Sequence, residues 1–272
     1  MANPSEAGLT GEPAGREPLD AVALAGRVPG WQLRTVAETG STNADLLAAA
    51  SRSEPHRTVL VADLQTTGRG RLARSWQSPR RAGLTLSVLL RLSPPAANRG
   101  WLPLLAGVAL ARAIGPEAAL KWPNDVLLGP DQRKVAGILS EATADVVVIG
   151  LGVNVSTTRQ ELPVPTATSL AIEAMPADRA ELLVRLLAEL DRQLERWSAA
   201  DGDATACGLA QEYRQRCATL GRPVTVDLPE RRLHGRATGI DDQGRLVVAV
   251  DGGGGPVVVA AGDVTHVRSV TG

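Results

Sequence analysis

The amino-acid sequence predicts a mixed α and β domain followed by a small β-barrel. Apolar runs bounded by Gly, Pro and Asn recur from Trp31 to about Val155, a pattern typical of strands. Helical patterns lie between and after these runs. From Arg222 onward, segments of about six residues alternate with turn signals, which indicates a compact all-β module.

The strands of the first domain are predicted from its apolar runs. The runs are shorter than most helices, and turn residues separate them. They cover Trp31–Val36, Thr58–Leu64, Leu84–Leu92, Ala118–Trp122, Val135–Leu139 and Val146–Val155.

Four helices are predicted in the same domain. The clearest is amphipathic, because leucines recur at three- and four-residue steps after a capping-box-like start at Asp178 and Glu181 and continue to Trp197. The other three follow weaker cap and periodicity signals. They cover Asn43–Ala50, with Ser41 or Thr42 as the cap, Trp101–Ile114 and Gly208–Leu220.

The C-terminal module and the domain boundaries follow from the change in pattern. Residues 1–28 are rich in Ala, Gly, Pro and Glu without periodicity, so we expect a disordered lead-in. The main domain is then expected over 29–220 and the small barrel over 221–272. The predicted barrel strands are Val224–Leu228, Leu233–Ile240, Leu246–Val250, Val257–Ala260 and Val264–Arg268.

Composition excludes several classes of protein. The 29 basic and 29 acidic residues balance, which argues against a general nucleic-acid binder. A hydrophobic content of 44% suffices for a buried core, so the chain is not a disordered protein. We find neither a signal-peptide pattern nor an apolar run of membrane-spanning length, and expect a cytoplasmic protein. Cys207 and Cys217 fit no disulfide or metal spacing and are expected to be reduced.

Lysine is scarce in this chain. Only Lys121 and Lys134 are lysines, whereas the other 27 basic residues are arginines. A primary amine is a compact point charge that fits where a planar guanidinium would collide. The two lysines therefore stand out as positions that arginine cannot fill, although chance survival on a solvated surface is the alternative.

The segment from Gln65 to Trp76 is the most distinctive local motif. Its glycines let backbone N–H groups approach an anion, and its three arginines offer planar donors for carboxylate or phosphate. Because like charges repel in an empty site, we expect residues 66–76 to be mobile without ligand and ordered with it. A solvated basic loop and an RNA-binding Arg-Gly segment are the alternatives.

Three further motifs offer polar groups. Lys121-Trp122-Pro123-Asn124-Asp125 closes one strand and opens the next through a turn, and Lys134 begins the following apolar strand. Ser41-Thr42-Asn43 places hydroxyls and an amide at a strand-to-helix junction, either as ligand contacts or as helix caps. Gly150 to Asn154 ends an apolar strand with glycines that either admit a ligand or mark a bulge.

Taken in order, these motifs resemble those of biotin–protein ligases. The resemblance runs from about Trp31 to the C-terminus and includes Arg222-Pro223-Val224, Gly239-Ile240-Asp241 and Val267-Arg268-Ser269 in the terminal module. It implies an α+β fold: a mixed sheet with helices like that of class II aminoacyl-tRNA synthetases, then an SH3-like barrel.

Two departures from the family pattern need stating. The family loop usually reads Gly-Arg-Gly-Arg-x-Gly-Arg, and Ala73 occupies the sixth position here. A Cβ there excludes much of the positive-φ space, so the closed loop is expected to differ slightly. The region before Trp31 is too short for the helix-turn-helix domain of regulatory members, so no DNA binding is expected.

The resemblance implies a two-step reaction. Biotin and ATP form biotinyl-5′-AMP and pyrophosphate, and a lysine of a biotin carboxyl carrier domain of a carboxylase then takes the biotin. Mg²⁺ is expected as the counter-ion of ATP, with no metal ligands identified. The implied catalytic residues are Lys134, Arg71 and Asp125, where Asp125 either acts on the acceptor amine or braces its turn.

The resemblance also assigns binding residues. Biotin contacts are expected from Ser41, Thr42, Asn43, Gln65, Gly68, Arg69, Gly70, Arg71, Lys134, Gly137 and Gly152, and nucleotide contacts from Arg71, Arg74, Trp76, Asn124, Lys134, Asn154 and Arg268. A lipoate–protein ligase shares the general fold and adenylation chemistry and is the nearest alternative function. A non-catalytic RNA-binding module is a more distant one, because the net charge is zero. The oligomeric state and the identity of the acceptor stay open.

Overall fold

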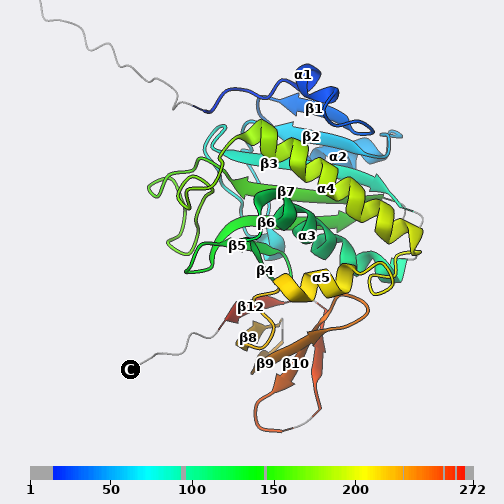
Figure 1. Cartoon of the computed structure of the whole chain (residues 1–272), viewed down its shortest axis with the longest axis vertical. Coiled ribbons are helices and arrows are strands. Elements are labelled where there is room, and N and C mark those ends of the chain that lie inside the picture. The colour runs from blue at the N-terminus through cyan, green and yellow to red at the C-terminus, as the bar shows by residue number, and fades with distance from the viewer. Residues whose placement is uncertain are drawn as a thin grey trace, which may run out of the picture.

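The computed structural model describes residues 15–92, 96–143, 146–228, 230–253, 255–260 and 262–266. A large mixed sheet with helices on both faces lies beside a smaller antiparallel sheet formed by the C-terminal part of the chain (Figure 1). This arrangement confirms the predicted order of a mixed α and β domain followed by a small all-β module. Among the described residues, no helix is both long and apolar enough to span a membrane.

The large sheet has seven strands in the order β1-β2-β3-β7-β6-β5-β4. The edge pair β1 and β2 is parallel, and every other neighbouring pair is antiparallel. The strands are β1 (Gln32–Val36), β2 (Thr58–Ala62), β3 (Gly83–Arg91), β4 (Ala119–Lys121), β5 (Asp125–Leu128), β6 (Arg133–Ala142) and β7 (Val146–Asn154).

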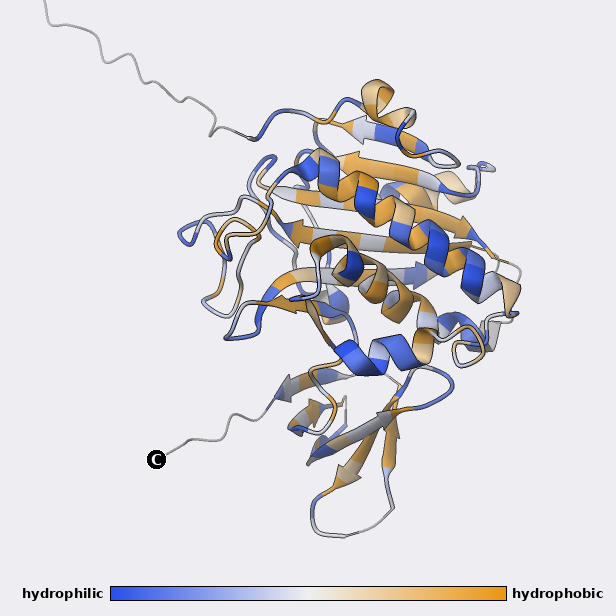
Figure 2. Ribbon diagram, viewed as in Figure 1, coloured by the Kyte–Doolittle hydropathy of each residue, from blue (hydrophilic) through white to orange (hydrophobic). Residues whose placement is uncertain are grey.

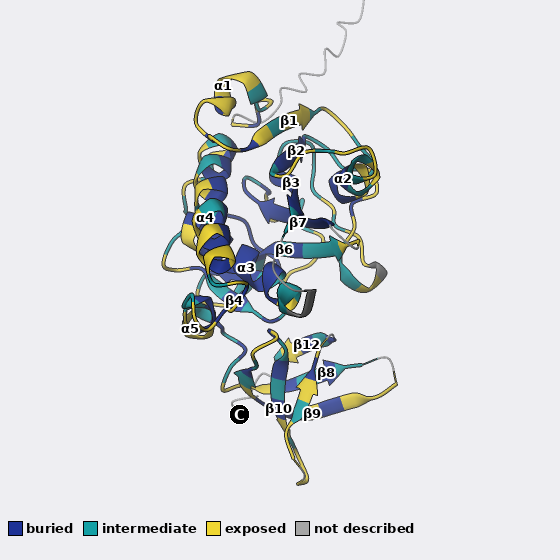
Figure 3. Cartoon of the chain, turned by 90° about the vertical axis from the view of Figure 1, so that its right-hand side faces the viewer, coloured by how far each residue is buried: buried dark blue, intermediate teal, exposed yellow. Residues whose placement is uncertain are grey.

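Helices cover the two faces of this sheet unequally (Figure 3). One face carries α3 (Leu102–Ile114) and α4 (Arg179–Ala199), which pack against each other, and the opposite face carries α2 (Thr42–Ala50). The leucines that predicted α4 lie on its buried side, and its polar residues lie on the other (Figure 2). Asp178 caps α4, but the Glu181 carboxylate pairs with Arg27.

The alternation of side chains along β3 explains why the two faces differ. Leu84, Leu86, Val88 and Leu90 belong to the core beneath α3 and α4. The residues between them point toward α2, where only Leu89 joins a small apolar cluster and Ser87 is polar and fully buried. The α2 face therefore has room for polar chemistry next to a rigid sheet.

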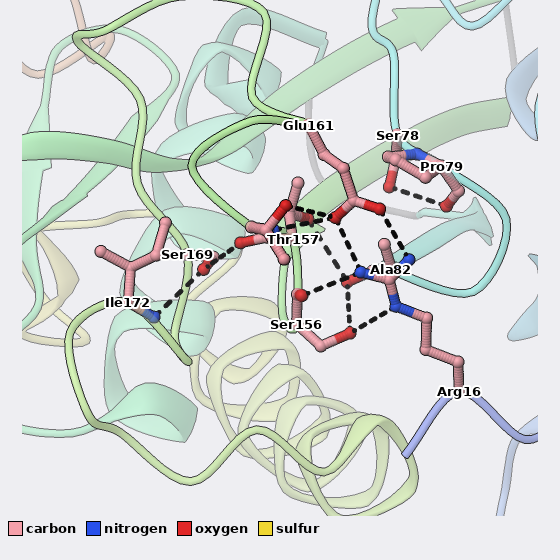
Figure 4. A network of polar contacts seen from close by, with 10 residues as sticks. Arg16, Ser78, Pro79, Ala82, Ser156, Thr157, Glu161, Ser169 and Ile172 are labelled. Carbon is pink, nitrogen blue, oxygen red and sulfur yellow. Dashed lines mark hydrogen bonds and ion pairs between the residues drawn. The ribbon is translucent and has the colours of Figure 1, made fainter. Parts of the chain in front are cut away.

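The prediction that residues 1–28 are disordered is wrong for residues 15–28. These residues form α1 (Ala21–Ala25), capped by Asp20, and bury Leu24 and Val28. Arg16 makes a bidentate ion pair with Glu161 at 2.7 and 2.9 Å and bonds to Ser156 (Figure 4). The composition, which has no periodicity, concealed this segment, because contacts with residues far along the chain hold it in place. Residues 1–14 lie outside the described part of the chain.

Helix α5 (Leu209–Arg216) ends four residues before the predicted Leu220. The chain leaves the helix at Cys217 to pair with Leu120 of β4, and the N–H of Ala218 donates to the carbonyl of Leu120 at 2.7 Å. Residues 217–218 therefore pair with the edge strand β4 instead of continuing the helix.

The smaller sheet has five antiparallel strands in the order β11-β10-β9-β8-β12. Its β9–β10 turn accepts hydrogen bonds from two buried indoles of the main domain: Trp101 donates to the Asp242 carbonyl at 2.8 Å and Trp122 to the Gly244 carbonyl at 2.9 Å. The strands are β8 (Pro223–Asp227), β9 (Arg232–Ile240), β10 (Leu246–Val250), β11 (Val257–Val259) and β12 (Asp263–His266).

Candidate active site

A single cavity collects most of the residues that the sequence singled out. It lies on the α2 face of the large sheet, between the Gln65–Trp76 loop, the β4–β5 turn, and residues 262–263 of the smaller sheet. The predicted site residues that line it are Ser41, Thr42, Asn43, Gln65, Arg69, Gly70, Arg71, Arg74, Trp76, Asn124, Asp125, Lys134, Gly137 and Gly152.

One end of the cavity is a preformed network of neutral hydrogen-bonding groups. Gln65 accepts from the backbone N–H of Thr42 at 2.8 Å and lies 3.0 Å from the Thr42 hydroxyl. Ser87 donates to Oδ1 of Asn43 at 2.6 Å and lies 2.7 Å from the Thr42 hydroxyl. A Cβ on Gly150 would lie 2.3 Å from that Asn43 oxygen, so only glycine leaves space for the amide. This end can orient a small polar ring by its hydrogen bonds.

Glu141 links this neutral network to the loop. Its Oε2 accepts from Nδ2 of Asn43 at 2.8 Å and from the Arg69 guanidinium at 3.2 Å. Asn43 is 3% exposed, so its amide orientation is fixed by Glu141 on one side and Ser87 on the other. The carboxylate thereby ties a loop arginine to the floor of the cavity.

The other end of the cavity is cationic. Arg71 donates to Oδ1 of Asn124 at 3.3 Å and to the carbonyl of Gly262 at 3.4 Å, while Arg74 pairs with Asp263. The three loop arginines thus each have partners in this conformation, which offsets the mutual repulsion expected from their sequence. Whether ligand orders the loop stays a prediction.

The backbone conformation of the loop bears on the presence of Ala73 where the family loop usually has glycine. A short 3-10 turn covers Arg71–Ala73, and the positive φ of 53° falls on Leu72 rather than on Ala73. Leu72 lines the cavity but is 62% exposed, so much of this apolar side chain at the loop tip is open to solvent.

Lys134, Asp125 and Trp76 form a cluster that belongs to the cationic end of the cavity. The Lys134 ammonium lies 2.7 Å from the Asp125 carboxylate and 5.7 Å from the centroid of the Trp76 ring. A Cβ on Gly152 would lie 2.3 Å from the indole, and one on Gly137 would lie 3.2 Å from both the indole and the ammonium. The two glycines face each other across β6 and β7, so together they make the space that Trp76 fills.

Trp76 also carries an unused donor. Its Nε1 is buried and has no hydrogen-bond partner among the described residues. A buried N–H without a partner costs roughly 1–3 kcal/mol. A ligand acceptor placed beside the ring would recover that free energy.

Burial and neighbouring charges shift the pKa values of two groups at this end of the cavity. Burial lowers the pKa of the Arg71 guanidinium, and Arg74 adds to that effect against the opposing charges of Asp125 and Asp263. Burial by itself raises the pKa of Asp263, but Arg74, Lys121 and Arg71 together lower that pKa below its ordinary value. Asp263 therefore stays ionised, and an anion entering the cavity competes with it for the cations.

Two predicted site residues, Gly68 and Asn154, are not among the residues that line this cavity. Gly68 faces a neighbouring hollow, where a Cβ would meet the Trp76 carbonyl at 2.4 Å. Asn154 is 4% exposed, and its amide donates to the Thr168 carbonyl at 2.9 Å, so it braces the end of β7. Arg268, with its neighbours Val267 and Ser269, lies outside the described residues.

The structure adds residues that the sequence reasoning missed. Thr85 and Ser87 were detectable, since polar residues at a period of two inside an apolar strand indicate a polar face. Glu141, which bonds to Asn43 and Arg69, carried no local signal, and neither did the lining residues Gly262 and Asp263, because only the fold brings the three to their partners. Within the described ranges, no group of three or more His, Cys, Asp or Glu side chains could hold a metal ion.

Comparisons with known proteins agree with this geometry. A model of the Biotin/lipoate A/B protein ligase family matches residues 37–154, and a model of the Biotin protein ligase C terminal domain matches residues 219–267. The chain is 45% identical to the biotin--[acetyl-CoA-carboxylase] ligase of Mycobacterium tuberculosis, over 93% of this chain and 97% of that protein.

More distant relatives also match most of the chain. The bifunctional ligase/repressor BirA of Escherichia coli is 34% identical over 86% of this chain and 74% of its own length. Among solved structures, the biotin protein ligase from Aquifex aeolicus in complex with biotin and ATP is 27% identical. It aligns with a TM-score of 0.69 over 88% of this chain and 99% of that chain. The chain therefore belongs to the biotin protein ligase family.

Proposed function

We propose that this protein activates biotin with ATP and transfers it to a lysine of a biotin carboxyl carrier domain of a carboxylase. The observation that carries the proposal is the distribution of polar and charged groups along the cavity. A buried neutral network suited to a ureido ring lies at one end, and arginines with Lys134 lie at the other. A ligand that is neutral at one end and anionic at the other fits this gradient.

In the first step, a biotin carboxylate oxygen forms a bond to the α-phosphorus of ATP and the bond to the leaving pyrophosphate breaks. Crowding these anions requires local positive charge, which Arg71 and Lys134 supply. Thr42, Asn43 and Gln65 hold the ureido ring, and Ser41 lines the same end. The unpartnered indole N–H of Trp76 is free to donate to the ligand.

In the second step, the acceptor amine attacks the acyl carbon of biotinyl-5′-AMP, AMP leaves, and the amine loses a proton. Asp125 lines the cavity beside Lys134. Their ion pair favours a role for Asp125 in positioning Lys134, and the carboxylate also remains available to orient the incoming amine. Trp76 and the loop exclude water, which would otherwise hydrolyse the mixed anhydride.

Biotin is favoured over lipoate as the substrate. The family that matches residues 37–154 includes both kinds of ligase, whereas the match over 219–267 is to a domain of biotin protein ligases. The polar network around Asn43 also suits a ring with two N–H donors and a carbonyl better than a dithiolane, which has no such groups.

The proposal extends to the finer features of the architecture. The large sheet is of the class II aminoacyl-tRNA synthetase type and the smaller one is SH3-like, with units near 29–220 and 221–272. Mg²⁺ enters as the counter-ion of ATP, without a protein cage. The cytoplasm is the proposed place of this reaction.

The direct test is to incubate the protein with labelled biotin, MgATP and a purified carrier domain. The proposal expects covalent label on the carrier, dependent on ATP and competed by unlabelled biotin but not by lipoate. No transfer of label, or preferential attachment of lipoate, would contradict it.

A further inference from the structure

The 166–173 segment pairs with β6 at Lys134, although none of its residues lines the cavity. The N–H of Lys134 donates to the carbonyl of Thr166 at 2.9 Å, and the carbonyl of Lys134 accepts from the N–H of Thr168 at 2.8 Å. These two bonds form a parallel bridge between Lys134 and Ala167. The segment therefore holds both backbone polar groups of the residue whose ammonium the proposed mechanism uses.

The regular sheet gives Lys134 little support of its own. The pairing of β7 with β6 ends at Ala136, and β7 then turns away, because the N–H of Val155 donates to the carbonyl of Ala82 at 3.2 Å. On the other side, the pairing of β6 with β5 skips one residue between Ala136 and Lys134, which is a bulge. A bulge bends a strand and redirects its side chains. The 166–173 segment thus takes the place of β7 at Lys134.

Asn154, the last residue of β7, joins the 166–173 segment to the sheet. Its side-chain amide donates to the carbonyl of Thr168 at 2.9 Å, and its backbone carbonyl accepts from the N–H of Leu170 at 3.1 Å. Between these contacts, the buried hydroxyl of Ser169 donates to the carbonyl of Thr157 at 2.6 Å (Figure 4). The segment is therefore fixed to the end of β7 at successive residues.

Glu173 closes the 166–173 segment onto the start of β6. One carboxylate oxygen accepts from the Thr168 hydroxyl at 2.5 Å and from the Arg133 guanidinium at 3.1 Å. A Cβ on Gly129 would lie 2.3 Å from the other oxygen, and the Glu173 side chain is 9% exposed. Hydrogen bonds to an ionised carboxylate are stronger than those between neutral groups. Because Arg133 directly precedes Lys134, the carboxylate binds both strands of the bridge together.

We infer that Thr168 and Glu173 are positioning residues for Lys134 in adenylation. A lysine side chain is flexible, so the place of its ammonium depends on how firmly its backbone is held. Under the proposed function, the ammonium lies beside both the biotin carboxylate and the α-phosphate, where a displacement of about 1 Å can lower the rate about 100-fold. The inference rests on that function, but the position of Lys134 can be measured without turnover.

The test removes one hydroxyl in Thr168→Val, which keeps the shape of the side chain. We expect the rate of adenylate formation to fall about tenfold. The KM for biotin should stay within about twofold of wild type, because the residues that hold the ureido ring do not contact the 166–173 segment. Thr168→Ser keeps the hydroxyl and should recover most of the rate. Glu173→Gln should lower the rate in the same direction, and it replaces Thr168→Val if that variant does not fold.

Thr58→Val is the matched control. Thr58 is as fully buried as Thr168, and its hydroxyl lies 3.1 Å from a carboxylate oxygen of Glu54, but β3 and β7 separate its strand from β6. Both valine variants should lower the thermal stability, because each leaves a carboxylate without a donor. Only Thr168→Val should slow adenylation. An equal loss of adenylation in the two variants, or an unchanged rate in Thr168→Val, would overturn the inference.

The scarcity of lysine provides a second measurement that does not depend on catalysis. In protein labelled with ¹³C-lysine, the side-chain signals come from Lys121 and Lys134 alone. The Trp76 ring lies 5.7 Å from the Lys134 ammonium, so movement of that side chain changes the ring-current shift of its ε-methylene signal. The Lys134 signal should move in Thr168→Val and return toward its wild-type position in Thr168→Ser, while the Lys121 signal stays in place.

The two measurements separate this inference from the proposed function. A Lys134 signal that does not move in Thr168→Val would overturn the positioning role, whatever the rate of adenylation. A Lys134 signal that moves, in a protein that forms no adenylate, would support the positioning role and contradict the proposed function instead.

Discussion

The two ends of the cavity are built in different ways. At the neutral end, Thr42, Asn43 and Ser87 are almost wholly buried and bond to one another on a single face of the large sheet. At the cationic end, the groups come from the loop, the β4–β5 turn and the smaller sheet, and the Arg74 side chain is 63% exposed in its ion pair with Asp263.

This difference indicates how each end gains free energy from a ligand. The neutral end is preorganised, so a ureido ring loses little to rearrangement of the protein. Exposed ion pairs contribute only about 0–1 kcal/mol each, so the cationic end exchanges them for ligand phosphates at little cost. The neutral end should therefore set the affinity for the vitamin, and the cationic end should set the rate of adenylation.

Replacing Lys134 should give the largest effect and break the cationic end. Lys134→Arg keeps the charge, but a guanidinium has no room between Asp125, Gly137 and Trp76. We expect adenylate formation to fall on the order of 100-fold while folding stays intact. ATP–pyrophosphate exchange and thermal unfolding measure the two quantities, and near-normal exchange would refute the role.

Filling the space under Trp76 should give the next largest effect. In Gly152→Ala the new Cβ would lie 2.3 Å from the indole and force the ring outward, at a cost of about 1–3 kcal/mol in adenylate affinity. Gly239→Ala is a matched control, because its Cβ would lie no closer than 4.0 Å to any other group. Equal binding of biotinyl-5′-AMP by both variants would show that the indole does not line the site.

Removing the charge of Glu141 should sharpen the comparison, because this carboxylate joins the two ends. Glu141→Gln weakens the contact with Arg69 and allows the Asn43 amide to turn, so we expect the KM for biotin to rise about fivefold. The KM for ATP should change less. Glu38→Gln breaks an ion pair with Arg80 outside the cavity and should change neither value. A larger change in the KM for ATP would contradict this assignment.

The smallest expected effect is on the pH dependence of stability, through His266 at the end of β12. Burial lowers the pKa of His266 to about 4, with help from Lys121 and Arg222 against Asp125. Its Nε2 lies 3.0 Å from the Thr219 hydroxyl, which accepts from the backbone N–H of Trp122. A neutral ring accepts from that hydroxyl, whereas a protonated ring cannot.

The sign of this effect follows from linkage. As pH falls, His266 takes up a proton near pH 6.5 in the unfolded chain but only near pH 4 in the folded chain. Protonation therefore favours the unfolded chain, and the free energy of unfolding decreases as pH falls from about 6.5 to 4. After allowance for solvent screening, the loss is about 1 kcal/mol. Chemical denaturation between pH 7 and 4.5 measures the free energy of unfolding. Wild type should show this loss, and His266→Asn should lack it. Glu161, whose pKa Arg16 lowers to about 2, adds a loss only below about pH 4.5. Identical pH profiles for both proteins would contradict this account.

The regular elements could be predicted from the sequence because local patterns determine them. The leucine spacing predicted α4, and the alternation of apolar residues predicted the strands of the smaller sheet, to within a few residues. The prediction failed where tertiary contacts decide. Arg16 and Glu161 are 145 residues apart, and the end of α5 depends on pairing with Leu120.

The residues of the candidate site also divide into those that local patterns predict and those that only tertiary contacts reveal. Motifs with unusual composition, such as the Arg-Gly loop and Lys134, could be found from residue types alone. Glu141 and Asp263 could not, because a single carboxylate in a strand has no distinguishing pattern until the fold brings it to an arginine. Asn154 belonged to a recognised motif, yet its hydrogen bond to Thr168 directs it away from the cavity.

The most direct measurement is a crystal structure with biotin and a non-hydrolysable ATP analogue bound. The account predicts the ureido ring within hydrogen-bonding distance, about 3 Å, of the Thr42, Asn43 and Gln65 side chains, and the carboxylate and α-phosphate equally close to Arg71 and Lys134. A complex in which the loop arginines and Lys134 lie far from both ligands would contradict it.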